Sequence, residues 1–165
     1  MITAPPLTAV AFAPFGDVLE ASGEPNRIIN AGLCGRWHDT ARLDFGDGRA
    51  GISLFRAQPR TLPYTCDLLE RHPEGSQAFI PMTAAAFLVI VALDEDGQPG
   101  MPLAFITAPG QGINLHRGTW HGVLTPLADT GIPDNGLFAV IDRIGSGANL
   151  QEAQVAPFTV QASSG

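Results

Sequence analysis

The sequence predicts an all-β fold, an antiparallel sandwich or barrel of short strands with minor helices. The 165-residue chain contains 19 glycines and 14 prolines, so turns are frequent and a helical bundle is disfavoured. The apolar segments are short, and turn residues separate them. Segment 65–72 alternates between two side-chain patterns, as a strand with two different faces does. A chain of this length favours a single domain over residues 1–165.

About ten strands are expected along the chain. They fall at 15–21, 36–45, 51–57, 65–72, 76–82, 87–93, 102–107, 112–116, 121–124 and 137–142. Segment 87–93 is apolar throughout, which is typical of a strand covered on both faces. A short helix fits at 8–13 or at 26–32, and the last five residues, QASSG, are expected to form a tail.

Composition excludes several classes of partner. The net charge is −7, every basic residue is arginine, and no basic run occurs. The chain therefore lacks the charge pattern of a nucleic-acid-binding protein and has little attraction to an anionic membrane. The most apolar stretch, 84–93, is about half of the ~20 residues that a membrane span needs. We expect a soluble cytoplasmic protein without a signal peptide, with Cys34 and Cys66 as small buried apolar side chains.

Two short clusters carry the residues that can do chemistry. The first has the pattern E-x-H-P-x-x-x-Q and contains Glu70, His72 and Gln77. Because side chains alternate along a strand, Glu70 and His72 are expected on the same face. The second cluster, INLHRGTWH, places His116 at a strand end and His121 just after a turn. Histidine is the usual proton carrier near pH 7, so both clusters are candidates for acid–base chemistry.

These clusters resemble the two motifs of the cupins, which are double-stranded β-helices. In the first motif Glu70 stands in place of a histidine and Gln77 in place of a glutamate. In the second, His121 occupies the histidine position and His116 a proline position. The resemblance implies that Glu70, His72, Gln77 and His121 converge inside the barrel. The two substitutions leave two alternatives open: a bound divalent metal (Ni, Mn or Zn), or direct hydrogen bonds from these side chains to a substrate.

Nearly the whole chain is similar to the ureidoglycolate lyase family. The similarity lies in segments 29–44 and 56–82, in the HRGTWH of residues 116–121, and in the opening AFAPFGDVLE and closing VIDRIG. The resemblance implies a cupin fold, usually in a homodimer. It also implies a carbon–nitrogen lyase that cleaves (S)-ureidoglycolate to glyoxylate and urea in allantoin (purine) catabolism.

That reaction needs a carboxylate ligand, a general base and a general acid. An arginine fork suits a carboxylate; Arg56 is the first choice for this role and Arg117 the second. The base is expected to be His121, His116 or a metal-bound group.

Glu70 or His72 is expected to be the general acid, and Gln77 to bind substrate. Two other functions use the same residues. One is an amidohydrolase that releases ammonia and carbon dioxide from ureidoglycolate, and the other is a non-catalytic cupin that binds a small anion.

Overall fold

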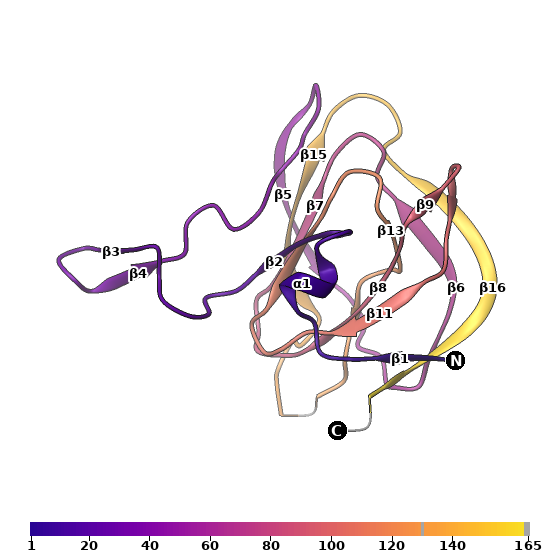
Figure 1. The fold of residues 1–165 in the computed structure, drawn as a ribbon, viewed down its shortest axis with the longest axis horizontal. Helices are drawn as coiled ribbons and strands as arrows, with labels where there is room; N and C mark the ends of the chain where they lie inside the picture. The colour runs from indigo at the N-terminus through magenta and orange to yellow at the C-terminus, as the bar shows by residue number, and fades with distance from the viewer. Residues whose placement is uncertain (130, 164–165) are drawn as a thin grey trace.

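In the computed structural model, which describes residues 1–129 and 131–163, two larger β-sheets share a common core (Figure 1). In the seven-stranded sheet the order is β1 (Ile2–Ala4), β16 (Gln151–Ala162), β6 (Tyr64–Arg71), β13 (Trp120–His121), β8 (Phe87–Ala92) and β11 (Leu103–Ile106), and β14 (Thr125–Pro126) also pairs with β8. In the five-stranded sheet it is β2 (Gly16–Leu19), β12 (Gly112–Leu115), β7 (Gln77–Pro81), β15 (Leu137–Ile144) and β5 (Arg49–Arg56). Two small hairpins, β3 (Arg27–Ile29) with β4 (Cys34–Arg36) and β9 (Asp94–Glu95) with β10 (Gln98–Pro99), complete the strands. The all-β prediction is confirmed.

The seven-stranded sheet curls until its two edges meet. The segment that follows β1 runs beside β11: Leu7 N–H donates to Ile106 O at 2.8 Å, and Ile106 N–H donates to Pro5 O at 2.9 Å. The backbone groups at these edges are thereby paired, and the sheet nearly closes into a barrel.

Strand β8 explains the apolar run of the sequence, because each of its faces packs against a different core. Phe87, Val89 and Val91 belong to the core between the two sheets. Leu88, Ile90 and Ala92 face a second core together with Trp120. All six residues of β8 are buried, so the prediction of a strand covered on both sides is confirmed.

The hairpin β3–β4 forms an arm that extends away from the barrel (Figure 1). Its turn contains Asn30, Ala31 and Gly32, all at positive φ. The side chains of Ile28 and Leu33 are 65% and 88% exposed. The helix considered at 26–32 is therefore wrong, whereas the one at 8–13 is confirmed as α1 (Ala9–Phe12).

The expected strand over 36–45 is also wrong beyond Arg36. Residues 37–45 form an irregular segment that returns from the arm to the barrel. At residue 42 side chains, not a neighbouring strand, pair the backbone: Arg42 N–H donates to Asp17 Oδ2 at 2.9 Å, and Asn114 Nδ2 donates to Arg42 O at 3.0 Å. Those partners lie far away in sequence, so local alternation could not reveal them.

The C-terminal part contains a long strand that the sequence did not predict. β16 pairs antiparallel with β6, with a shift in register between Gln154 and Phe158, and β1 joins its far edge in parallel. Residues 161 and 162 of the expected tail belong to β16, and residues 164–165 lie outside the described residues. Cys66 is buried as expected, while Cys34 is only half-buried on the arm. In the part of the chain that is described, no helix has both the length and the apolarity to cross a membrane.

Candidate active site

The register of three strands brings Glu70 and His121 together. On β13, His121 lies opposite Glu70 of β6 and opposite Val91 of β8. Val91 faces the core between the two sheets. Directly opposed residues share one face of a sheet, so Glu70 and His121 also point between the sheets. His72 lies two residues beyond Glu70, just past the end of β6.

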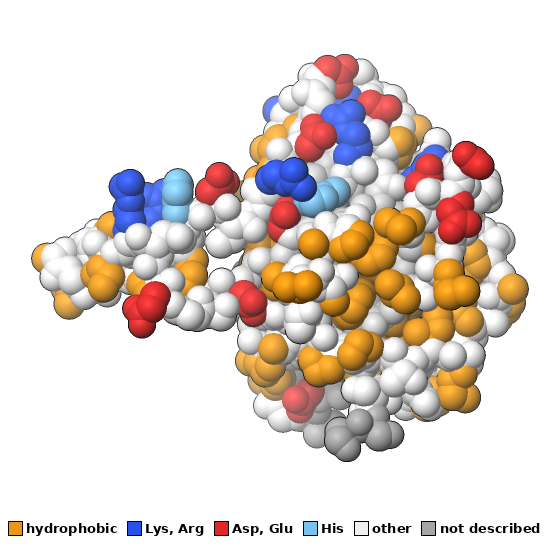
Figure 2. All heavy atoms as spheres, viewed as in Figure 1, with side chains coloured by type: hydrophobic (Ala, Val, Ile, Leu, Met, Phe, Trp, Pro, Cys, Tyr) orange, Lys and Arg blue, Asp and Glu red, His pale blue; other side chains and the backbone are white. Residues whose placement is uncertain are grey.

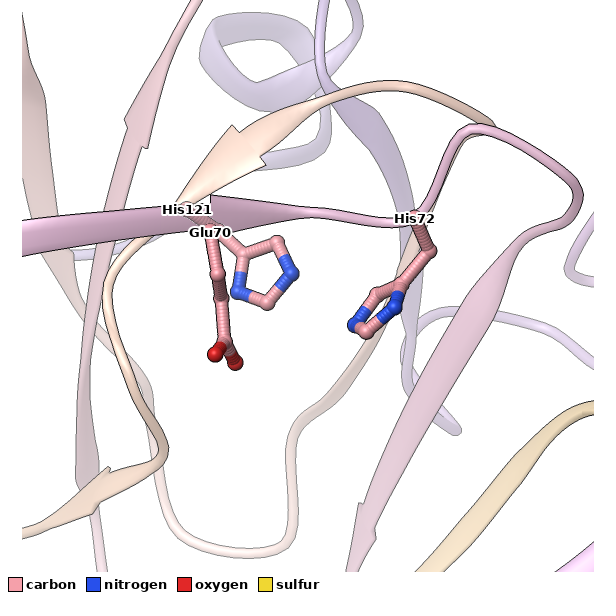
Figure 3. A group of neighbouring side chains, drawn as sticks. All are labelled: Glu70, His72 and His121. Atoms are coloured by element: carbon pink, nitrogen blue, oxygen red, sulfur yellow. The ribbon is translucent and has the colours of Figure 1, made fainter. Parts of the chain in front are cut away.

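These three side chains form a close group, called the His–Glu group below (Figure 3). One ligand atom from each of Glu70, His72 and His121 lies within 4.8 Å of the other two. The two imidazole rings are tilted by 36°, with centroids 5.3 Å apart. The structure thus brings together residues from both sequence clusters, as expected from the cupin resemblance.

Backbone carbonyls fix the same tautomer in both histidines. His72 Nδ1 lies 2.6 Å from Asn149 O, and His121 Nδ1 lies 3.0 Å from Gly122 O. Because a carbonyl oxygen can only accept, each Nδ1 carries the proton in the neutral ring, and each Nε2 keeps a free lone pair. Both Nε2 atoms are buried and have no hydrogen-bond partner among the described residues. They are available to a substrate or an ion.

Burial shifts the pKa values of two members in opposite directions. His121 is 3% exposed, and burial, with a smaller effect of His72, lowers its pKa to about 4. Burial also raises the pKa of Glu70, with Glu152 adding to the rise and His72 opposing it. Loss of hydration disfavours the charged form of both groups. At neutral pH His121 is therefore uncharged and can accept a proton.

The opposite wall of the site comes from the five-stranded sheet. Gln77 and Phe79 lie on the same face of β7, and the Phe79 ring is 6.4 Å from the ring of His121. Gln77 is 5% exposed, and its Nε2 donates to Asp142 Oδ2 at 3.2 Å. A cavity of about 20 Å³ lies beside His121 and Phe79, which is room for about one water molecule.

The donor set of the His–Glu group fits a divalent cation. Two imidazole nitrogens and a carboxylate oxygen converge, and each histidine offers an Nε2 atom without a hydrogen-bond partner among the described residues. Imidazole suits Zn²⁺ and Ni²⁺, and carboxylate suits Mn²⁺. The Nδ1–carbonyl hydrogen bonds are the kind that orient histidine ligands.

His116 lies outside the His–Glu group. Residues 113 and 115 of β12 point into the core, so alternation turns Asn114 and His116 to the outer side. There His116 Nε2 lies 3.0 Å from Asp17 Oδ2. Burial raises the pKa of Asp17, but hydrogen bonds from Asn114, the Arg42 backbone and His116 outweigh it and lower the pKa overall.

The two candidate arginines lie in different parts of the molecule. Arg117 donates from Nε and Nη2 to the two carboxylate oxygens of Asp44, at 2.8 and 2.7 Å. This ion pair lies beside a hollow of about 300 Å³ that His116 also lines. Its turn lies next to the His–Glu group, since Gly118 N–H donates to His72 O at 3.0 Å. Arg56 lies at the end of β5, is 68% exposed, and pairs with Asp134 at 3.9 Å.

Two residues of the site are absent from the sequence predictions. The backbone carbonyl of Asn149 accepts from His72 Nδ1. The side-chain Oδ1 of Asn149 accepts from Glu74 N–H at 2.8 Å. A backbone carbonyl leaves no trace in residue type, so sequence gives no signal for it. Asp142 lies in the VIDRIG segment, and alternation from Phe138 and Val140 would have placed it on the inner face of its strand.

A nearly closed, mostly antiparallel barrel with two histidines and a carboxylate on its inner wall is typical of a protein of the cupin type. The family model described as "Ureidoglycolate lyase" matches residues 1–161. The chain belongs to the ureidoglycolate lyase family.

Curated relatives agree with this assignment. The ureidoglycolate lyase of Rhodobacter capsulatus is 64% identical over 148 residues, which cover 89% of each chain. That of Chelativorans sp. is 52% identical over 92% of this chain and 90% of its own. Ureidoglycolate lyase 2 of Rhizobium meliloti is 51% identical over 89% of this chain and 88% of its own.

Proposed function

We propose that this protein cleaves (S)-ureidoglycolate into glyoxylate and urea. The observation that carries the proposal is the pair of buried Nε2 atoms of His72 and His121, which have no hydrogen-bond partner among the described residues and lie beside the carboxyl group of Glu70. The relatives named ureidoglycolate lyase support the choice of substrate.

The reaction is an internal redistribution of one proton and one electron pair. A base removes the proton of the substrate hydroxyl group, and the oxygen forms the aldehyde carbonyl of glyoxylate. The carbon–nitrogen bond breaks, its electron pair goes to nitrogen, and an acid protonates that nitrogen to give urea. No water and no oxidant is consumed.

The His–Glu group supplies both partners of this proton transfer. His121 is uncharged at neutral pH because of its lowered pKa, so its Nε2 accepts the hydroxyl proton. Glu70, whose pKa is raised, retains a proton closer to neutral pH and donates it to the leaving nitrogen. His72 is the alternative acid. His116 remains a predicted alternative base, although its side chain lies on the outer side of β12.

Glu70, His72 and His121 are the residues that would hold a divalent metal, with Gln77 as a fourth candidate. When bound, such an ion supplies positive charge that polarises a substrate oxygen. The protein residues still have to orient the substrate and return the proton to the leaving group.

The substrate carboxylate requires a cation. Arg117 is favoured over Arg56, because the turn that carries Arg117 is hydrogen-bonded to His72. Both arginines remain predictions for this role.

One experiment tests the proposal against its two alternatives. Purified protein is incubated with (S)-ureidoglycolate, and glyoxylate, urea and ammonia are quantified separately, together with bound metal. Equal amounts of urea and glyoxylate support the lyase. Ammonia without urea indicates the amidohydrolase, and thermal stabilisation by glyoxylate without turnover indicates a non-catalytic anion-binding protein.

The same samples address the metal. If a metal is required, chelation abolishes urea production and added Zn²⁺, Ni²⁺ or Mn²⁺ restores it. Full activity in a preparation verified as metal-free assigns the chemistry to the side chains alone.

We further propose that the protein is a homodimer that acts in allantoin catabolism in the cytoplasm. The exposed apolar arm supports the dimer. Figure 2 shows hydrophobic side chains on the part of the molecule that protrudes from the barrel, and Ile28 and Leu33 of this hairpin are exposed. Exposed apolar surface of this kind marks interaction sites. The pathway and the cellular location remain predictions from the family resemblance.

A further inference from the structure

The amide group of Gln77 is satisfied at one end only. Its Nε2 donates to Asp142 Oδ2 at 3.2 Å, while its Oε1 is buried and has no partner among the described residues. Leaving a buried acceptor unpaired is unfavourable, because the group has lost its hydrogen bonds to water. An unpaired oxygen in the wall of a candidate site therefore points to a ligand that donates to it.

Asp142 determines which end of this amide faces the site. It lies directly opposite Gln77 in the register of β15 and β7. An ionised carboxylate only accepts hydrogen bonds, so only the NH₂ end of Gln77 can pair with it. The carbonyl end must then point elsewhere. Without Asp142, the two ends of the amide have nearly the same shape and neither orientation is imposed.

Among the described residues, no donor pairs with Gln77 Oε1. On the other side of β7, the strand neighbour of Gln77 is Leu115, which is apolar and 3% exposed. Phe79 lies two residues after Gln77 on the same face of β7, and its ring contacts the ring of His121. Gln77 Oε1 is thus an acceptor on the wall that faces the His–Glu group.

We infer that Asp142 is a positioning residue that holds Gln77 Oε1 toward the ureido half of the substrate. This inference rests on the proposed lyase function. The ureido group and the urea formed from it are rich in N–H donors, whereas glyoxylate carries none. A fixed acceptor oxygen therefore binds the urea end and favours a nitrogen leaving group over one with oxygen in its place. It takes no part in proton transfer.

Product inhibition separates this role from a structural one. Asp142→Ala lets the Gln77 amide rotate, so the inhibition constant for urea is expected to rise about tenfold, the equivalent of one hydrogen bond. The inhibition constant for glyoxylate is expected to stay unchanged. If the alanine variant does not fold, Asp142→Asn replaces it, because asparagine has the shape of aspartate. A smaller rise of the inhibition constant for urea is then expected, because the Oδ1 atom of asparagine can still accept a hydrogen bond from Gln77. Asp67→Asn, on the exposed face of β6, is the matched control.

A reciprocal exchange provides a rescue test. Gln77→Glu alone sets two carboxylates against each other and is expected to weaken urea inhibition. Combining it with Asp142→Asn restores a donor–acceptor pair across the two strands. The amide introduced on β15 then donates to the carboxylate introduced on β7, whose second oxygen stays free as an acceptor. Urea inhibition is expected to recover toward the wild-type value.

Three results would overturn the inference. The first is an unchanged inhibition constant for urea in Asp142→Ala. The second is an equal rise of the inhibition constants for urea and glyoxylate. The third is a double variant that urea inhibits no more strongly than it inhibits Gln77→Glu. Failure of the proposed function looks different, because the wild-type protein would then release no urea from ureidoglycolate.

Discussion

At the scale of single residues, hydrogen bonds to backbone carbonyls prepare the site for chemistry. Asn149 O and Gly122 O each hold an Nδ1–H, so the two reactive nitrogens are the inward Nε2 atoms. Neither histidine has to change tautomer before it accepts a proton. Each histidine is therefore expected to react through Nε2.

Replacing His121 with glutamine is expected to lower kcat about 10²–10⁴-fold, the usual contribution of a general acid or base. Glutamine is neutral and polar but cannot accept and release the proton. Urea release under saturating substrate measures the effect, and circular dichroism checks the fold. His38→Gln, on the exposed segment after the arm, is the control. A His121→Gln enzyme with wild-type kcat would remove His121 from the mechanism.

Acid should destabilise the metal-free protein through His121. Its pKa is about 4 in the folded protein, against about 6.5 for an unperturbed histidine, so between these values the unfolded chain binds the extra proton. Stability is thus complete above pH 6.5 and falls as the pH is lowered, by about 3 kcal/mol at pH 4. Urea denaturation from pH 7 to pH 4 in EDTA measures the loss. His121→Gln should show a shallower pH dependence, and equal slopes would contradict the assignment.

The two arginines can be distinguished by KM. Arg117→Ala is expected to raise KM about 10- to 100-fold if it holds the substrate carboxylate, since a hydrogen bond to a charged group contributes about 1.5–3 kcal/mol. Arg56→Ala is expected to leave KM within about twofold if Arg117 has that role, and Arg49→Ala on the same strand is the control. A raised KM in Arg56→Ala with an unchanged KM in Arg117→Ala would assign the binding of the substrate carboxylate to Arg56.

At the scale of elements, the arm is the segment whose form the barrel does not explain. Its backbone is paired within the hairpin, yet its apolar side chains Ile28 and Leu33 contribute to neither core.

The expected strand at 36–45 and the unpredicted β16 show why some strands are hard to predict from sequence. Whether a segment pairs as a strand depends on which distant segment lies beside it, and here Asp17 and Asn114 hold residue 42.

Leu33→Arg is expected to convert the proposed dimer into a monomer without lowering the melting temperature of the barrel by more than a few degrees. A buried unpaired charge opposes association, while the free arm tolerates it. Light scattering measures the mass. Met101→Arg, at a site that is 83% exposed, is the control. A dimer that survives both Leu33→Arg and Ile28→Arg does not use the arm.

At the scale of the whole molecule, stability comes from two cores that share β8. Phe87 and Phe138 join the two sheets, with ring centroids 5.1 Å apart and an angle of 84° between the rings. Both are 1% exposed. This edge-to-face contact ties the wall that bears His121 to the one that bears Gln77.

Phe138→Ala is expected to lower the free energy of unfolding by about 3–5 kcal/mol, because it leaves a cavity between the sheets. Val10→Ala, at a side chain that is 89% exposed, should change it by less than about 0.5 kcal/mol. Chemical denaturation at neutral pH compares the two. A loss below about 1 kcal/mol in Phe138→Ala would mean that the core refills.

Turn residues and strand alternation are local properties, so the all-β class, most strand positions and the shared face of Glu70 and His72 could be predicted from the sequence alone. The motif resemblance added His121 and Gln77. The three-dimensional contacts were needed to show that His116 pairs with Asp17, that the Asn149 carbonyl holds His72, and that residues 37–45 are irregular. Each of these outcomes depends on contacts between segments distant in sequence, and no local pattern encodes which distant segments meet.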